Sequence, residues 1–220
     1  SATVRSLGRQ PSHATSKVLD DEARSLEEKA AAIRKLRLAV HQTNVAGELQ
    51  SLLQQPEEKI SLLRAALLLA QHDNPELDTT PTEELVERMT AELKGDKEIA
   101  KKGLPALKRL NRYLFAENGF HVPRNSDSAS NSYMNEVLDD REGLPIMLST
   151  LYLELAQRLG IKGCFGLALP VRFMVGYREP DPDAELIIFD MVQDGKQITL
   201  EQAASAVGAE DVDYLHGFTT

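Results

Sequence analysis

Apolar residues at steps of three and four predict that the chain begins with a long amphipathic helix. The stripe that they form consists of Leu19, Ala23, Leu26, Ala30, Ile33 and Val40. Charged residues lie largely outside the stripe, which therefore fits either a coiled-coil seam or a helix docked on the rest of the protein. Its many alanines favour docking. Gly47 weakens the following segment, where residues 45–54 predict a short second helix.

Three more helices are predicted within residues 56–118. Pro56 and the two glutamates after it suit a helix start, because proline fits the first turn and acids favour the positive end of the helix dipole. Residues 60–71 are apolar nearly all round, so we expect this helix to be buried. A fourth helix follows a Thr-Pro-Thr-Glu-Glu start, and a fifth, over residues 96–116, is expected to break near Pro105.

Beyond residue 160 the hydrophobic pattern changes from helical spacing to short apolar runs. Before that point a short helix is expected to end at Leu138, and a longer one covers residues 146–159. The runs of strand length are residues 163–169, 173–177 and 185–192. A closing helix over residues 199–207 follows. Helices first and a late meander of strands is the order of an α+β fold.

We expect four segments along the chain. They are a disordered leader (1–15), N-terminal helices (16–55), a helical subdomain (56–118) and a core with a small antiparallel sheet (119–220). The first 17 residues are basic and rich in serine and threonine, a composition shared by organelle transit peptides and disordered leaders. The sequence therefore leaves a location in the plastid stroma and a cytoplasmic one both open.

Composition narrows the classes of function. The 220 residues are 42% hydrophobic, enough for one full core with an added helical subdomain. A net charge of −9 argues against nucleic acid as the main partner. No apolar run reaches the length of a membrane span. The single cysteine, Cys164, excludes a multi-cysteine zinc site, and the five histidines are scattered, so we expect neither a metal nor a cofactor.

Two blocks of sequence carry a resemblance to a known family. The first reads Asn-Ser-Tyr-Met-Asn-Glu-Val-Leu over residues 131–138, and the second begins Gly-Leu-Pro-Ile-Met-Leu-Ser at residue 143 and continues to Gly160. They resemble the SirB-type transglutaminase-like family. The resemblance covers roughly residues 57–207 and implies a papain-like core. Its relatives include bacterial proteins with helical-repeat tails and an F-box protein, which implies protein handling more than small-molecule chemistry.

The resemblance also implies where catalytic groups would stand. Such a fold uses a thiolate at a helix N-terminus, a histidine on a strand and an acid or amide that orients the histidine. At the matching positions this chain has Ser149, Arg172 and Asp190. An arginine stays protonated and cannot accept a proton from a hydroxyl. We therefore expect Arg172 and Asp190 to form an ion pair, and the three residues to line a binding cleft together with Tyr152.

Our first hypothesis is a non-catalytic module that binds another protein as an adaptor, assembly or proteostasis factor. The contact surfaces would be the cleft and the stripe from Leu19 to Val40. Alternatively, the chain is a regulatory subunit that docks to its partner through the first long helix. An enzymatic alternative is a thiol hydrolase or acyltransferase that uses Cys164 with His121. A free cysteine at the start of an apolar strand is more often a small core residue. Whether the chain is an enzyme, and its oligomeric state, stay open.

Overall fold

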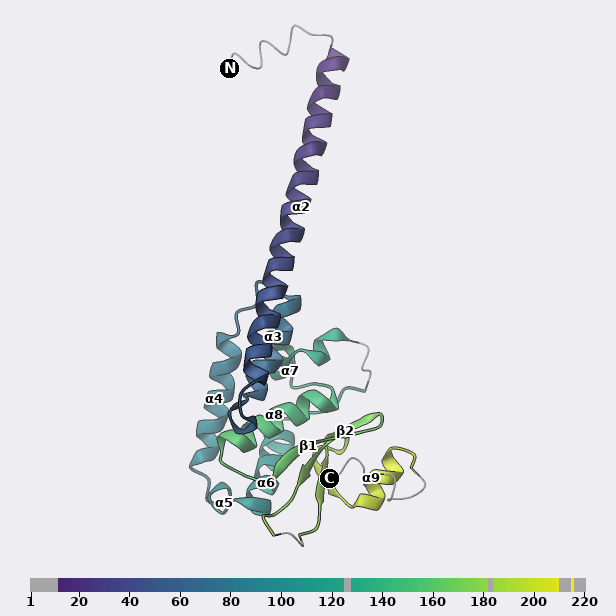
Figure 1. Cartoon of the computed structure of the whole chain (residues 1–220). Helices are drawn as coiled ribbons and strands as arrows, with labels where there is room; N and C mark the ends of the chain where they lie inside the picture. The colour runs from purple at the N-terminus through teal and green to yellow at the C-terminus, as the bar shows by residue number, and fades with distance from the viewer. Residues whose placement is uncertain (1–11, 125–127, 182–183, 210–214, 216–220) are drawn as a thin grey trace. The chain divides into compact units, whose positions relative to one another are not determined.

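A computed structural model describes residues 12–124, 128–181, 184–209 and 215. The fold is α+β, as predicted: a helical region comes first and a small four-stranded antiparallel sheet follows (Figure 1). The chain divides into two compact units, Ser1–Gly47 and Glu48–Thr220. The segment boundaries expected from the sequence stay predictions.

α2 (Ser12–Leu53) is one uninterrupted helix that includes every residue of the predicted stripe. The separate second helix expected over residues 45–54 is wrong, because Gly47 lies within α2. A glycine in a helix costs only about 1 kcal/mol relative to alanine, and strong helix formers such as Ala46 and Glu48 flank it. Residues 12–15 of the expected leader are helical, whereas residues 1–11 lie outside the described part of the chain.

The stripe of α2 is exposed. Leu19, Leu26, Ile33 and Val40 are 53%, 56%, 67% and 52% exposed. Docking of this stripe on the rest of the protein stays a prediction. Although α2 is long, neither it nor any other helix among the described residues is apolar enough over a sufficient length to cross a membrane.

The second unit is helical before its sheet begins. The helical segments are η1 (Glu57–Lys59), α3 (Leu62–Asp73), α4 (Thr80–Lys94), α5 (Lys97–Ala100), α6 (Gly103–Asn111), η2 (Arg112–Glu117), η3 (Ala129–Ser132), α7 (Met134–Asp140) and α8 (Pro145–Arg158). The expected break in the fifth helix separates α5 from α6, and Lys102 adopts a φ of 57° there. The helix start expected at Pro56 leads only into η1, and α3 itself begins at Leu62. Ser61 caps α3, because its hydroxyl accepts a hydrogen bond from the Arg64 amide at 3.1 Å.

The sheet is an antiparallel meander in the order β1-β2-β3-β4. Its strands are β1 (Cys164–Leu169), β2 (Arg172–Tyr177), β3 (Ile187–Asp190) and β4 (Lys196–Ile198), with η4 (Met191–Gln193) between the last two. The sequence pattern does not predict β4, because a three-residue strand is too short to show alternation and is defined by its pairing with β3. The expected closing helix is α9 (Leu200–Ala206).

The two faces of the sheet belong to different hydrophobic clusters. Val175 and Phe189 pack in the larger cluster with α8, whereas Met174 and Ile188 pack in a second cluster with α9. Successive side chains of a strand point to opposite faces, so neighbours in sequence join different clusters. Figure 1 shows α8 beside β1 and β2, against which it packs. Three of the four residues expected in the cleft, Ser149, Tyr152 and Arg172, lie on α8 and β2.

Candidate functional site

Ser149 is the residue that the resemblance noted in the sequence predicts at the position of a catalytic thiolate. It is the fifth residue of α8, one turn beyond the proline that starts the helix. Its side chain is fully buried, and its hydroxyl makes no hydrogen bond to any residue that the structure describes. A serine nucleophile requires a general base within hydrogen-bond reach. Among the described residues, Ser149 has no such base, and its hydroxyl therefore lacks the activation that acyl transfer requires.

Arg172 and Asp190 form the ion pair that the sequence predicts. Arg172 Nη1 lies 3.2 Å from Asp190 Oδ2, and the Asp190 side chain is fully buried while that of Arg172 is 23% exposed. Asp190 also accepts hydrogen bonds from the Val192 amide at 3.0 Å and from Gln193 Nε2 at 2.8 Å. Three donors thus satisfy this carboxylate, which joins the start of β2 to the end of β3 and to η4.

Tyr152 is a core residue. Its hydroxyl donates a hydrogen bond to the Leu107 carbonyl at 3.0 Å, and its ring lies 6.0 Å from that of Phe189. Burial raises the pKa of the Tyr152 phenol well above its usual value. Ser149, Tyr152 and Asp190 are all fully buried, so of the four residues expected in a cleft only Arg172 presents side-chain atoms to a partner.

Cys164 begins β1, where it pairs with Tyr177. Burial raises the pKa of its thiol to about 12. Only the thiolate is an effective nucleophile, and at neutral pH a thiol with that pKa is ionised in roughly one molecule in 10⁵. Cys164 is half-buried and packs against the larger hydrophobic cluster.

His121 is engaged elsewhere. Its Nδ1 lies 3.1 Å from the Gly119 carbonyl, and its Nε2 lies 3.1 Å from Glu142 Oε2. Within the described ranges no hydrogen bond connects His121 to Cys164, so the structure does not assemble a cysteine–histidine pair from the two candidates. The same part of the chain contains no group of three or more histidine, cysteine, aspartate or glutamate side chains able to hold a metal ion.

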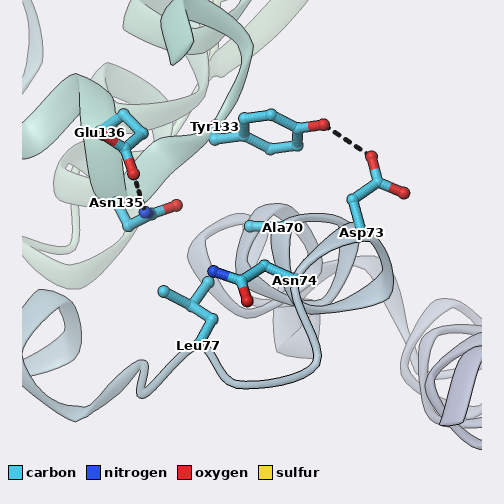
Figure 2. Close-up of a pocket in the computed structure, with 7 residues that line it drawn as sticks. All are labelled: Ala70, Asp73, Asn74, Leu77, Tyr133, Asn135 and Glu136. Carbon is cyan, nitrogen blue, oxygen red and sulfur yellow. Dashed lines mark hydrogen bonds between the residues drawn. The ribbon is translucent and has the colours of Figure 1, made fainter. Parts of the chain in front are cut away.

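A polar pocket lies between the C-terminal end of α3 and the start of α7 (Figure 2). Its volume is about 220 Å³, and it is lined by Ala70, Asp73, Asn74, Leu77, Tyr133, Asn135 and Glu136. Tyr133 donates a hydrogen bond to Asp73 at 2.6 Å, and this bond is the main reason that the pKa of Asp73 is lowered. Asn135 Nδ2 donates to Glu136 at 2.8 Å, whereas Asn135 Oδ1 is buried without a hydrogen-bond partner among the described residues.

Comparison with known proteins identifies the family. Residues 79–213, more than half of the chain, match the family model described as the transglutaminase-like superfamily. The chain belongs to this superfamily. The SirB-type resemblance noted in the sequence is thereby confirmed, and α4 to α6 fall inside the matched region together with the sheet.

Relatives of this transglutaminase-like chain come from bacteria and animals. A UPF0162 protein of Xylella fastidiosa strain 9a5c is 31% identical over 154 residues, which are 69% of this chain and 53% of the relative. F-box only protein 21 of Homo sapiens is 26% identical over 215 residues, which are 84% of this chain and 34% of the relative. The chain therefore spans about half the length of the first relative and about a third of the second. No solved structure matches the chain.

Sequence reasoning missed one buried charge in the transglutaminase-like core. Glu154 of α8 is 2% exposed and accepts hydrogen bonds from the Leu63 amide at 3.1 Å and from Arg158 Nε at 2.7 Å. It also accepts one from the Ser61 hydroxyl at 3.1 Å. Glu154 thus places a negative charge at the N-terminus of α3, which the helix dipole favours. The signal in the sequence is an acid between leucines at 153 and 155, on a helix that is mostly apolar.

Proposed function

We propose that this chain is a non-catalytic protein-interaction module, an adaptor, assembly or proteostasis factor built on a transglutaminase-like scaffold. The observation that carries the proposal is the ion pair between Arg172 and Asp190 at 3.2 Å. A guanidinium cannot act as the general base of acyl transfer, because it stays protonated at any working pH. Similarity to F-box only protein 21 over 84% of the chain supports a role in protein interaction.

The turn between β1 and β2 is our candidate contact. Val171 is 95% exposed and adopts a φ of 55°, a left-handed conformation that is rare for a β-branched residue. Strain at such a position persists only where the surrounding structure imposes it, and it is often found at functional sites. Val171 precedes Arg172, so one exposed apolar side chain and one partly exposed cation stand together at the end of the sheet. This combination suits an apolar contact with an acidic neighbour on a partner protein.

Three forms of the chain test the proposal by affinity capture from the native source and mass spectrometry. The unmodified chain and a Ser149→Ala, Cys164→Ala double variant should capture the same proteins, because binding does not require a nucleophile. The Val171→Asn variant should lose them while staying folded, since asparagine tolerates a left-handed backbone but lacks the apolar contact.

An enzyme would behave differently in the same experiment. We expect no turnover of glutamine-donor peptides with amine acceptors, and none of thioester or ester substrates. Turnover by the unmodified chain that the double variant loses would overturn the proposal and favour the thiol hydrolase or acyltransferase. Circular dichroism of all three forms establishes that a lost interaction does not reflect a lost fold.

A further inference from the structure

Four exposed apolar residues of α2 recur at an interval of seven. Leu19, Leu26, Ile33 and Val40 each keep more than half of their surface in solvent. Seven residues are close to two helical turns, so these side chains lie along one line on the helix. Ala23 and Ala30 lie four residues after the first two leucines on the same side. Small side chains at such positions leave room for the close approach of a second helix.

Charge divides α2 into two halves of opposite sign. Residues 17–28 contain five acids and two bases, a net charge of −3. Residues 29–47 contain four bases and no acid, a net charge of +4. The change of sign falls between Leu26 and Ile33, at the centre of the exposed line. The helix dipole gains little from this separation, because the first turn of α2 holds no acid and the last turn holds no base. Two helices laid head to tail, by contrast, bring the opposite halves together.

We infer that this segment of α2, residues 16–47, pairs in antiparallel orientation with the same segment of a second copy of the chain. A two-fold axis between residues 29 and 30, at the centre of the exposed line, places Leu19 beside Val40 and Leu26 beside Ile33 of the second copy. The same axis places the negative half of each helix beside the positive half of the other. A parallel pair would instead bring like charges together along its whole length. The inference does not depend on the proposed function.

The first test is sedimentation equilibrium of the whole chain against two matched variants. Ile33→Asp puts a carboxylate in the centre of the exposed line and should raise the dimer dissociation constant by about 100-fold or more, because the interface would bury an unpaired charge. Leu38→Asp introduces the same carboxylate at an exposed leucine away from the line, and should change the constant by less than about threefold. High salt should weaken the unmodified dimer, since opposite charges are screened.

The second test reads the orientation. In an antiparallel pair, a Glu22→Cys chain mixed with an Arg37→Cys chain should form a disulfide between copies, whereas either variant alone should not. Efficient disulfide formation by each variant alone indicates a parallel pair and overturns the inference. A monomeric unmodified chain at all concentrations overturns it as well. If Ile33→Asp lowers the unfolding temperature of a monomer instead, the stripe packs on its own chain, which again contradicts the inference.

Discussion

α2 and α8 carry apolar stripes of the same helical spacing but differ in what surrounds them. Leu151 and Leu155 of α8 are at most 1% exposed, whereas Leu26 and Ile33 of α2 are more than half exposed. The 14 residues of α8 include only two charged ones, Glu154 and Arg158, and the two pair with each other at 2.7 Å. α2 carries charges around much of its circumference. Spacing therefore predicts that a helix forms, and the charge content beside the stripe indicates whether its own domain covers it.

The largest expected difference is in the rate of thiol labelling beside α8 and on α2. Native Cys164, which packs beside α8, should react with iodoacetamide about 1,000-fold more slowly at neutral pH than a cysteine introduced on α2 by Leu26→Cys. The reason is that burial raises the pKa of Cys164 from 9.0 to about 12, which lowers the thiolate fraction. Mass spectrometry of the two labelled peptides in one Leu26→Cys sample, at a concentration where the chain is monomeric, measures both rates. Equal rates would contradict the burial of Cys164.

The same pKa sets a direction for stability at high pH. The folded thiol keeps its proton up to a higher pH than the unfolded one, because its pKa lies above the ordinary value. Its contribution to the free energy of unfolding is therefore complete below pH 9 and is lost as the pH rises from 9 towards 12. Urea unfolding of the native chain and of a Cys164→Ala variant across this range measures it. The stability difference between the two should stay constant below pH 9.

Truncating a leucine to alanine should destabilise the protein far more in α8 than in α2. Leu155→Ala in α8 should lower the free energy of unfolding by about 2–5 kcal/mol, because it removes buried carbon atoms and leaves a cavity. Leu26→Ala in α2 should change it by less than about 0.5 kcal/mol at concentrations where the chain is monomeric. Urea titrations followed by circular dichroism measure both. A loss of several kcal/mol from Leu26→Ala would mean that α2 is covered by its own chain.

Removing a buried carboxylate from the sheet beside α8 should cost about 3 kcal/mol. Asp190→Ala leaves Arg172 and Gln193 without their acceptor, and breaking a buried pair from one side is strongly destabilising. Arg172→Ala should cost about as much, because it leaves the fully buried Asp190 carboxylate without a counter-charge and with only the Val192 amide and Gln193 as donors. A loss below about 1 kcal/mol from both variants would contradict the burial of this pair. Thermal or urea unfolding provides the comparison.

The smallest change in stability is expected for a substitution within helix α2. Gly47→Ala should stabilise it by about 0.5–1 kcal/mol, because alanine restricts the unfolded chain and a Cβ at this position meets no atom within 4 Å. The measurement is the helical signal of the whole chain during thermal unfolding. A decrease in helicity would show that the glycine is required at this point of α2.

The sequence predicts some contacts of the candidate site and not others. It predicts the Arg172–Asp190 pair, because the resemblance places both residues and their charges are opposite. It does not predict the pocket between α3 and α7, since Asp73 and Tyr133 are 60 residues apart and meet only through helix packing. The contact between Glu154 and the start of α3 is likewise not predicted, because its two residues are 91 positions apart. Such contacts depend on the distance between elements, which periodicity does not encode.

By itself the sequence determined the α+β order, the helix spacing of α2 and α8 and the family resemblance, and it predicts that Arg172 replaces a proton acceptor. These properties depend on the type of each residue and on its neighbours along the chain. Only the tertiary structure decided that Ser149, Tyr152 and Asp190 are buried, and that Cys164 and His121 are engaged in separate places. Burial and proximity arise from packing between distant segments. They set the pKa of Tyr152 and of Cys164, and they decide which groups each candidate residue can reach.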